Sequence, residues 1–343
     1  MKVRVQEVVE GLKKVRPGLS TKELIEQSDS FLFREGLVFT FDGEVSVSTK
    51  SPFGDEIEGG LKAEPLVQLF SRLKDEEVDA TVKEGSLIIE GAKSKAGLPI
   101  EEEVKLQTPK PPKDWEKIDG GGFIEAVKLA EAAASDNASR PILTCLHMTP
   151  KYIEACDNFR MTRAFLTKGG GPQDLCFSAE SARSLVRGFE PTALGLAGGK
   201  EDAWVHFRCK GEVVFSCRRV VGEYPDLTKL LKVEGETLTL KPKATKAALH
   251  RAQVFSATEF SQDEKVLVRM KEGVLQIRSK GPQGWFKETV GAKGPDCLFH
   301  INPSFFTHAL DLGCELIVTK DRIKLQGDSF VHVVCLEQAP EKA

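Results

Sequence analysis

Leu32-Phe33-Arg34-Glu35-Gly36-Leu37-Val38-Phe39 is the stretch that decides the fold, because the chain repeats its pattern twice. The later copies are Val82-Lys83-Glu84-Gly85-Ser86-Leu87-Ile88-Ile89 and Val268-Arg269-Met270-Lys271-Glu272-Gly273-Val274-Leu275. In each copy, apolar residues flank a Glu-Gly dipeptide, which predicts two antiparallel strands around a tight turn. Three copies of one hairpin, without a catalytic signature, favour a scaffold built from repeated modules over a pocket enzyme.

Amphipathic helical segments recur between these hairpins. A first helix is expected in each module, over residues 6–14, 123–134 and 245–254, where apolar side chains recur at helical spacing. A second helix is expected to begin near Glu64-Pro65, Ala179-Glu180 and Asn302-Pro303. Because helices and alternating strands each have one apolar face to bury, we predict an α+β fold in a triplicated layout.

Two segments suggest domain boundaries. Pro109-Lys110-Pro111-Pro112-Lys113, followed by Gly120-Gly121-Gly122, cannot continue a helix or a central strand. A charged turn at residues 232–236 precedes a new strand at 237–240. We therefore expect three domains of similar size, at residues 1–118, 119–235 and 236–343.

The composition limits the possible classes of protein. The 343 residues carry 48 basic and 51 acidic side chains, a net charge of −3, which argues against a uniformly basic nucleic-acid coat but permits a basic inner face and an acidic outer one. The eight cysteines form no CxxC pair, and no apolar run approaches 18 residues. The start of the chain is unlike a signal peptide. We expect reduced, mostly buried cysteines, no membrane segment and a cytoplasmic location.

Motifs for chemistry are weak. Residues 195–200 partly match a phosphate-binding loop, but no Ser or Thr follows Lys200 and predicted strands flank the segment, so we interpret it as a hairpin turn. The six histidines lack metal-ligand spacing, and Cys156 has no nucleophile motif around it. We expect no catalytic residue, no metal and no cofactor.

Basic residues are more frequent on some of the predicted helices than on others. They flank the first helix and surround the fifth, and Arg183 and Arg187 share one face of the fourth. The third and sixth helices show no basic excess. This pattern alone leaves open whether these side chains contact nucleic acid or only solvent.

Two segments of the sequence resemble a known protein family, and this resemblance favours contact with nucleic acid. Residues 138–143 (Ala-Ser-Arg-Pro-Ile-Leu), followed by residues 152–161 (Tyr-Ile-Glu-Ala-Cys-Asp-Asn-Phe-Arg-Met), resemble the middle domain of the bacterial beta sliding clamp, the processivity subunit of the replicative polymerase. Residues 222–227 (Gly-Glu-Tyr-Pro-Asp-Leu) are similar to that family's G-R-F-P-D-Y element. The order of helices and hairpins agrees along almost the whole chain. Cys156, Asn158 and Phe159 replace the family's threonine, glycine and histidine, and Cys335-Leu336-Glu337-Gln338 replaces its proline-methionine ending.

The resemblance implies a ring. In that family each domain places two helices inside and sheets outside, and two three-domain subunits join head to tail. Twelve helices at about 9 Å spacing leave a hole of roughly 24 Å, enough for a duplex about 20 Å wide. Sequence-independent contacts with DNA phosphates are then expected from Lys13, Lys14, Arg16, Lys22, Arg72, Arg183, Arg187, Lys246 and Arg251.

The resemblance also implies partners, namely the replicative DNA polymerase and the clamp loader, which dock by short peptides between the second and third domains. The corresponding pocket would comprise Arg140, Leu143, Cys156, Asn158, Phe159, Arg160, Met161, Pro225, Leu230, Val333, Val334 and Cys335. Core packing is the other interpretation for most of these. Three alternatives stay open: a clamp paralogue serving repair or plasmid or virus replication, a protein-interaction scaffold that never encloses DNA, and, least favoured, a hydrolase or transferase on another α+β fold.

Overall fold

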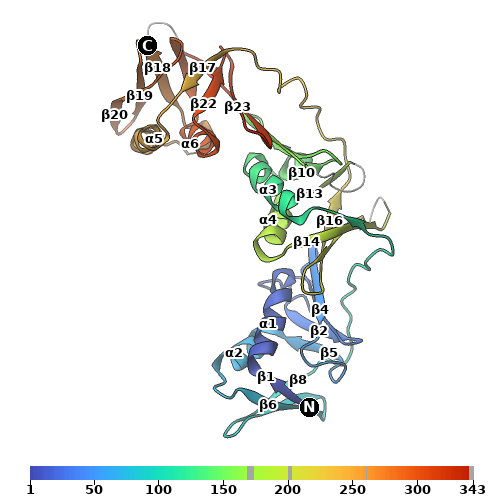
Figure 1. The fold of residues 1–343 in the computed structure, drawn as a ribbon. Helices are drawn as coiled ribbons and strands as arrows, with labels where there is room; N and C mark the ends of the chain where they lie inside the picture. The colour runs from blue at the N-terminus through green and yellow to red at the C-terminus, as the bar shows by residue number, and fades with distance from the viewer. Residues whose placement is uncertain (168–173, 200–202, 260, 340–343) are drawn as a thin grey trace. The chain divides into compact units, whose positions relative to one another are not determined.

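A computed structural model describes residues 1–167, 174–199, 203–259 and 261–339 (Figure 1). Its strands pair antiparallel and its helices are few, so the α+β class predicted from the sequence is confirmed. The chain divides into two compact units. The first unit comprises Met1–Lys128, Cys145–Lys151 and Lys168–Gly222, and the second comprises Leu129–Thr144, Tyr152–Thr167 and Glu223–Ala343.

The first unit contains two sheets. A four-stranded sheet has the order β1-β6-β7-β8, and a larger one runs β10-β13-β16-β4-β3-β2-β5, with β15, β14 and β9 continuing from β16. The strands are β1 (Lys2–Arg4), β2 (Ser30–Arg34), β3 (Leu37–Phe41), β4 (Val45–Lys50), β5 (Gly59–Lys62), β6 (Glu77–Lys83), β7 (Ser86–Glu90), β8 (Lys95–Pro99), β9 (Glu116–Lys117), β10 (Cys145–Met148), β13 (Leu175–Ser178), β14 (Pro191–Ala197), β15 (Trp204–Cys209) and β16 (Val213–Val220).

Helices of the first unit bury their apolar stripes against these sheets. They are α1 (Val5–Val15), α2 (Ala63–Arg72), α3 (Gly120–Ala130), whose last two residues belong to the other unit, and α4 (Ala179–Gly188). Helix α1 packs against α2 and against β4, and buries Val8, Leu12 and Val15. Phe123 of α3 and Phe177 of β13 both contact the ring of Phe207, so these three rings anchor the middle part of the chain.

Strand β15 is covered on both faces, which its alternating sequence did not predict. Phe207 faces the rings beneath the helices, whereas Trp204 packs edge-on against Phe41 at a centroid distance of 5.6 Å. His206 is fully buried, with Nδ1 2.7 Å from the Ser216 hydroxyl. Leu106, just before the proline-rich stretch, joins the apolar cluster around Trp204. The face of the sheet that carries Trp204 is therefore shielded from solvent as well.

The second unit also contains two sheets, with strand orders β17-β22-β23-β24-β12-β11 and β20-β19-β18-β21-β25. The strands are β11 (Tyr152–Cys156), β12 (Arg160–Phe165), β17 (Glu236–Thr239), β18 (Val266–Lys271), β19 (Val274–Gly281), β20 (Gly284–Gly291), β21 (Cys297–Ile301), β22 (Glu315–Val318), β23 (Arg322–Gln326), β24 (Phe330–Cys335) and β25 (Glu337–Gln338). Strand β12 pairs with β24, with Thr162 opposite His332, so residues far apart in sequence share one sheet.

Two helices of the second unit, α5 (Pro242–Ser256) and α6 (Pro303–Leu312), lie side by side (Figure 1). The Asn302 side chain caps α6 by accepting from the backbone N–H groups of Ser304 and Phe305. Between these helices and both sheets lies a core that includes Leu249, Ile277 and Phe306. Short 3-10 turns complete the chain, at Arg16–Gly18, Glu131–Ala133, Pro141–Thr144 and Ser261–Asp263.

The three Glu-Gly hairpins are confirmed. In each, two residues separate paired strands, and both take positive φ: 53° and 69° at Glu35-Gly36, 50° and 71° at Glu84-Gly85, and 49° and 80° at Glu272-Gly273. Positive φ at both central positions defines the type I′ turn, whose twist matches that of the flanking strands. All six predicted helices are also present, with bounds that differ from the expected ones by a few residues.

The prediction that Gly120-Gly121-Gly122 breaks regular structure is wrong, because these residues form the first turn of α3. A Cβ atom at Gly120 would lie 2.2 Å from the carbonyl oxygen of Pro191. The glycine is therefore needed for a close approach between the helix start and β14, and not for a bend.

Other expectations are settled in part. Residues 195–197 pair with 204–206, as the hairpin interpretation of the 195–200 segment requires, while Lys200 lies outside the described residues. All eight cysteines are free; five are buried, and Cys314 and Cys335 are exposed. Within the described ranges, no helix is both long and apolar enough to cross a membrane.

Candidate functional site

The β11–β12 hairpin ends in a turn that its own side chains hold. The Asp157 carboxylate accepts from the backbone N–H groups of Phe159 (2.7 Å) and Arg160 (2.8 Å), and from Arg160 Nε (3.1 Å). The Cys335 N–H on β24 donates to the Phe159 carbonyl at 2.7 Å. This hairpin end is thus fixed both locally and by the neighbouring strand.

Tyr224 brings together the two sequence segments that carry the family resemblance. Its hydroxyl accepts a hydrogen bond from the Cys156 backbone N–H at 3.0 Å and lies 3.6 Å from the Cys156 sulfur. Burial raises the pKa of the Tyr224 hydroxyl and of the Cys156 thiol, so both groups stay protonated near neutral pH. A protonated, buried thiol is a poor nucleophile, and the contact is structural.

An apolar cluster is built around Met161 of β12 and Val333 of β24, which lie opposite each other in the sheet. Its buried members are Cys156, Met161, Leu227, Val233, Val331 and Val333. Half-buried side chains form its rim, namely Leu143, Tyr224, Leu230, Leu231 and Ile317. The cluster therefore offers partly exposed leucines over a buried apolar floor, the surface that an apolar peptide anchor needs.

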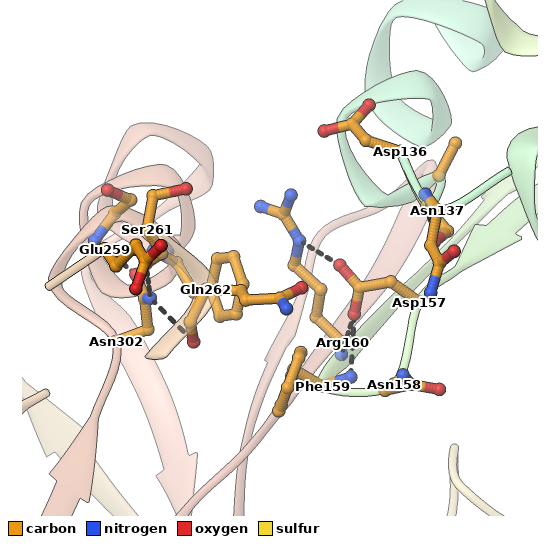
Figure 2. A pocket seen from close by; sticks show the side chains of 14 residues that line it. Asp136, Asn137, Asp157, Asn158, Phe159, Arg160, Glu259, Ser261, Gln262 and Asn302 are labelled. Atoms are coloured by element: carbon orange, nitrogen blue, oxygen red, sulfur yellow. Dashed lines mark hydrogen bonds and ion pairs between the residues drawn. The ribbon is translucent and has the colours of Figure 1, made fainter. Parts of the chain in front are cut away.

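A polar cavity of about 620 Å³ opens at the hairpin end. Figure 2 shows Asp136, Asn137, Asp157 and Asn158 on one side of it and Glu259, Ser261, Gln262 and Asn302 on the other. The Asn302 amide donates to the Ser261 carbonyl at 2.8 Å, which ties the start of α6 to the 3-10 turn before β18. The volume of the cavity is in the range of sites for small ligands, although its lining is more polar than that of most such sites.

At this cavity, the Arg160 side chain lies between a carboxylate and an aromatic ring. Its guanidinium lies 4.2 Å from the centroid of the Phe305 ring, and its Nε is held by Asp157. The Phe159 and Phe305 rings are 5.9 Å apart. The next residue, Met161, belongs to the apolar cluster, so the hairpin end connects the cavity to the cluster.

The structure separates the predicted pocket residues into groups. Leu143, Cys156, Met161, Leu230 and Val333 meet in the apolar cluster, and Asn158, Phe159 and Arg160 line the polar cavity. Arg140 is exposed and donates to the Asn158 side-chain oxygen at 3.2 Å. Three predicted members lie elsewhere: Pro225 is exposed on the segment before Leu227, Val334 points into the core beneath α6, and Cys335 is exposed and contributes its backbone N–H.

Sequence reasoning missed the far wall of the cavity. Ser261, Gln262, Asn302, Ser304 and Phe305 line it, although they lie about 100 residues or more from the hairpin. The Asn-Pro dipeptide at 302–303 did signal a helix start, but nothing local indicated what that helix end would face.

The predicted DNA contacts fall into two electrostatic groups. Within the described part of the chain, six of these cations have no carboxylate within ion-pair distance, namely Lys13, Lys14, Arg16, Lys22, Arg72 and Arg187. All six are exposed, and four lie on or directly beside α1 and α2. Arg183 is half-buried on α4, one helical turn before Arg187.

On α5, both predicted contacts are already paired. Lys246 forms an ion pair with Asp311 of α6, and Arg251 forms two hydrogen bonds with Glu288 of β20, at 2.9 and 2.7 Å. The Glu288 carboxylate raises the pKa of Arg251, and Arg251 lowers that of Glu288. These two positions therefore present less free positive charge than the six unpaired cations. Among the residues described, no cluster of three or more His, Cys, Asp or Glu side chains could hold a metal ion.

The chain has the repeated-domain fold of the bacterial DNA polymerase III beta sliding clamps. It resembles the DNA polymerase III subunit beta of Pseudomonas aeruginosa with a TM-score of 0.84 and 17% identity, over 99% of this chain and 100% of that one. It also resembles the DNA polymerase sliding clamp of Bacillus subtilis (TM-score 0.82, 18% identity, 99% of each chain) and the DNA polymerase III beta chain of Streptococcus pneumoniae (0.83, 19%, 98% and 99%). No family model and no curated protein matches the sequence. The fold expected from the resemblance is thus confirmed.

Proposed function

We propose that this chain is a non-catalytic DNA sliding clamp, a ring-shaped homodimer that encloses duplex DNA in the cytoplasm and tethers a replicative polymerase. The likeness to solved clamps over 99% of the chain carries the proposal, since a module or fragment with another role would match only in part. We further propose that the ring contains three domains per subunit, at residues 1–118, 119–235 and 236–343, joined head to tail.

The mechanism would be topological. A closed ring cannot leave the duplex sideways, so retention needs no tight contact, and strong contacts would slow sliding. Weak, sequence-independent attraction between long cationic side chains and phosphates is sufficient. The exposed cations on α1, α2 and α4 suit this role, because no carboxylate holds them in place. Lys246 and Arg251 would contribute less, because Asp311 and Glu288 already neutralise them.

Solution mass and DNA topology test the ring together. The 37.7 kDa chain should elute as a dimer of twice that mass in light scattering. Loaded by a clamp loader onto nicked circular plasmid, it should stay bound through gel filtration and leave when a restriction enzyme linearises the DNA. A strict monomer, or equal retention on linear and circular DNA, would contradict enclosure and favour a protein-interaction scaffold.

Charge reversal tests which face meets DNA. We expect Lys13→Glu/Lys14→Glu/Arg187→Glu to lose most retention on circular DNA. The matched control is Lys93→Glu/Lys110→Glu/Lys113→Glu, which changes net charge equally at exposed positions away from the helices. Equal loss in both variants would show that bulk charge, and not the helix face, holds the DNA.

We also propose that polymerase and clamp loader dock by short peptides at the β11–β12 hairpin end. The half-buried Leu143 and Leu230 would receive an apolar anchor, and the polar cavity beside Arg160 would bind peptide main-chain groups. This division of labour is typical of peptide recognition, where apolar pockets give affinity and polar groups fix orientation.

Peptide binding by fluorescence anisotropy tests the docking site, with a labelled peptide that carries leucine and phenylalanine anchors. Leu230→Lys should weaken binding at least tenfold, because it places a charge where the anchor packs. Met161→Ala is a less clean probe, because Met161 is buried and its removal also leaves a cavity. Wild-type affinity in Leu230→Lys would remove the proposed pocket while leaving the ring proposal intact.

A further inference from the structure

The polar cavity at the β11–β12 hairpin end carries an unbalanced negative charge. Three carboxylates line it, those of Asp136, Asp157 and Glu259, and Arg160 is the one cation among the lining residues that the structure describes. Three negative charges and one positive charge give the lining a net charge of −2. All four residues belong to the second unit, so the cavity lies within one compact body.

The balanced part of this charge lies in the interior of the cavity. Asp157 and Arg160 form an ion pair at 3.1 Å, and their side chains are only 13% and 16% exposed. The Arg160 guanidinium also lies 4.2 Å from the centroid of the Phe305 ring. Because this inner pair is neutral as a whole, it does little to offset the charge of the other two carboxylates.

Asp136 and Glu259 form the mouth of the cavity. Both are exposed, and Figure 2 shows them on opposite sides of the cavity. Within the described ranges, neither carboxylate forms an ion pair. Each lies in the loop that follows the first helix of its module, α3 or α5, so the repeated fold itself places the two charges. The nearby Arg140 donates to the Asn158 side chain and does not line the cavity.

An aromatic ring stands beside this acidic mouth. Phe159 lines the cavity, is half-buried, and has its ring centroid 5.9 Å from that of Phe305. Arg160 covers Phe305, whereas no cation of the described residues lies over the Phe159 ring. A guanidinium is attracted both to a carboxylate and to the face of an aromatic ring. The inner Asp157–Arg160–Phe305 arrangement shows one guanidinium already held in this way.

We propose that the mouth of the cavity binds an arginine side chain of the docking peptide, attracted by Asp136 and Glu259 and stacked on Phe159. The inference rests on the proposed docking of peptides at this hairpin end, and it specifies which partners dock. Lysine fits less well, because an ammonium group lacks the planar fork that pairs with carboxylates and stacks on a ring. An acidic side chain would meet like charge at the mouth.

Fluorescence anisotropy with the full chain at 50 mM salt tests the proposal. All the labelled peptides carry the leucine and phenylalanine anchors. One has only alanine beside the anchors, and the others place a single arginine, lysine or glutamate at each of the three positions on either side. We expect arginine at one of these positions to bind about fivefold more tightly than alanine, as for exposed ion pairs combined with a cation–π contact. Lysine should gain less, and glutamate should bind more weakly than alanine.

Two variants locate the origin of this preference. Asp136→Asn/Glu259→Gln should bind the arginine and alanine peptides equally, because the charge at the mouth is gone. The control Glu315→Gln/Asp328→Asn removes the same charge at exposed positions of β22 and of the turn between β23 and β24, and should keep the preference.

The outcomes separate this inference from the docking proposal. An arginine preference that survives in Asp136→Asn/Glu259→Gln, or the absence of any preference in the wild type, would overturn the inference and leave the docking site intact. Tighter binding of a glutamate peptide would also overturn it, and would assign the cavity to an acidic side chain bound by Arg160. Failure of every peptide to bind, the alanine peptide included, would refute the docking site itself and this inference with it.

Discussion

His332 makes the junction between β12 and β24 sensitive to acid. It is fully buried, its Nδ1 lies 2.8 Å from the Thr162 hydroxyl, and its ring packs edge-on against His308 of α6 at 5.0 Å. Burial, together with nearby His308 and Arg160, lowers the pKa of His332 from 6.5 to about 3. Burial also lowers the pKa of His308, so both rings resist protonation in the folded chain.

The direction of the effect follows from proton uptake. The unfolded chain protonates His332 near pH 6.5, whereas the folded chain keeps it neutral until about pH 3. The folded state therefore has its full stability with respect to His332 above pH 6.5. As the pH falls toward 3, the free energy of unfolding decreases progressively. At pH 5 the gap of 1.5 pH units corresponds to roughly 2 kcal/mol. His308 acts in the same direction.

Hydrogen exchange measured by mass spectrometry can resolve this loss at the junction itself. Peptides covering β12 and β24 should lose about 2 kcal/mol of protection between pH 8 and pH 5, after correction for the intrinsic exchange rate. His332→Gln keeps a polar side chain beside Thr162 but cannot titrate, so it should lose about 2 kcal/mol less over the same range. His250→Gln, an exposed position on α5, serves as the control. Equal pH dependence in wild type and His332→Gln would refute the reasoning.

Two further predictions concern stability measured by urea unfolding. Glu154→Ala should destabilise the chain by about 3–5 kcal/mol, because it leaves Arg163, paired at 2.7 Å and 9% exposed, without its carboxylate, whereas the double change Glu154→Leu/Arg163→Met should cost much less. If the double variant were no more stable than Glu154→Ala, the ion pair would not be the cause. Gly120→Ala should cost about 1–3 kcal/mol, because its new methyl would lie 2.2 Å from the Pro191 carbonyl oxygen. Gly121→Ala, whose nearest neighbour would be 3.7 Å away, should be neutral or stabilising, and equal losses would contradict the steric argument.

The hairpins and helix starts were predictable because their causes are local. A Glu-Gly pair between apolar runs determines its own turn, since two adjacent residues with positive φ require a glycine at one of them. The cap of α6 is equally local, because Asn302 accepts from backbone groups only two and three residues ahead. For such elements, nothing beyond a few residues of sequence is needed.

The rest of the site depends on contacts between distant segments. The Lys246–Asp311 and Arg251–Glu288 pairs join residues 65 and 37 positions apart, so no helical pattern could reveal that these cations are neutralised. The glycine run at 120–122 was misread for the same reason, because the carbonyl that requires Gly120 belongs to Pro191. The far wall of the polar cavity likewise needs the packing of α6 beside the hairpin.

The distribution of paired and unpaired charge allows the proposed roles to be tested separately. The free cations of α1 and α2 belong to the first unit, while the hairpin end and the apolar cluster belong to the second. Substitutions in one unit need not disturb the fold of the other, because each has its own core. Acid should weaken the β12–β24 junction through His332, and with it the peptide site, before it affects the exposed lysines. We therefore expect peptide binding to fall at pH 5 while DNA retention persists, because His332 is buried and the lysines are exposed.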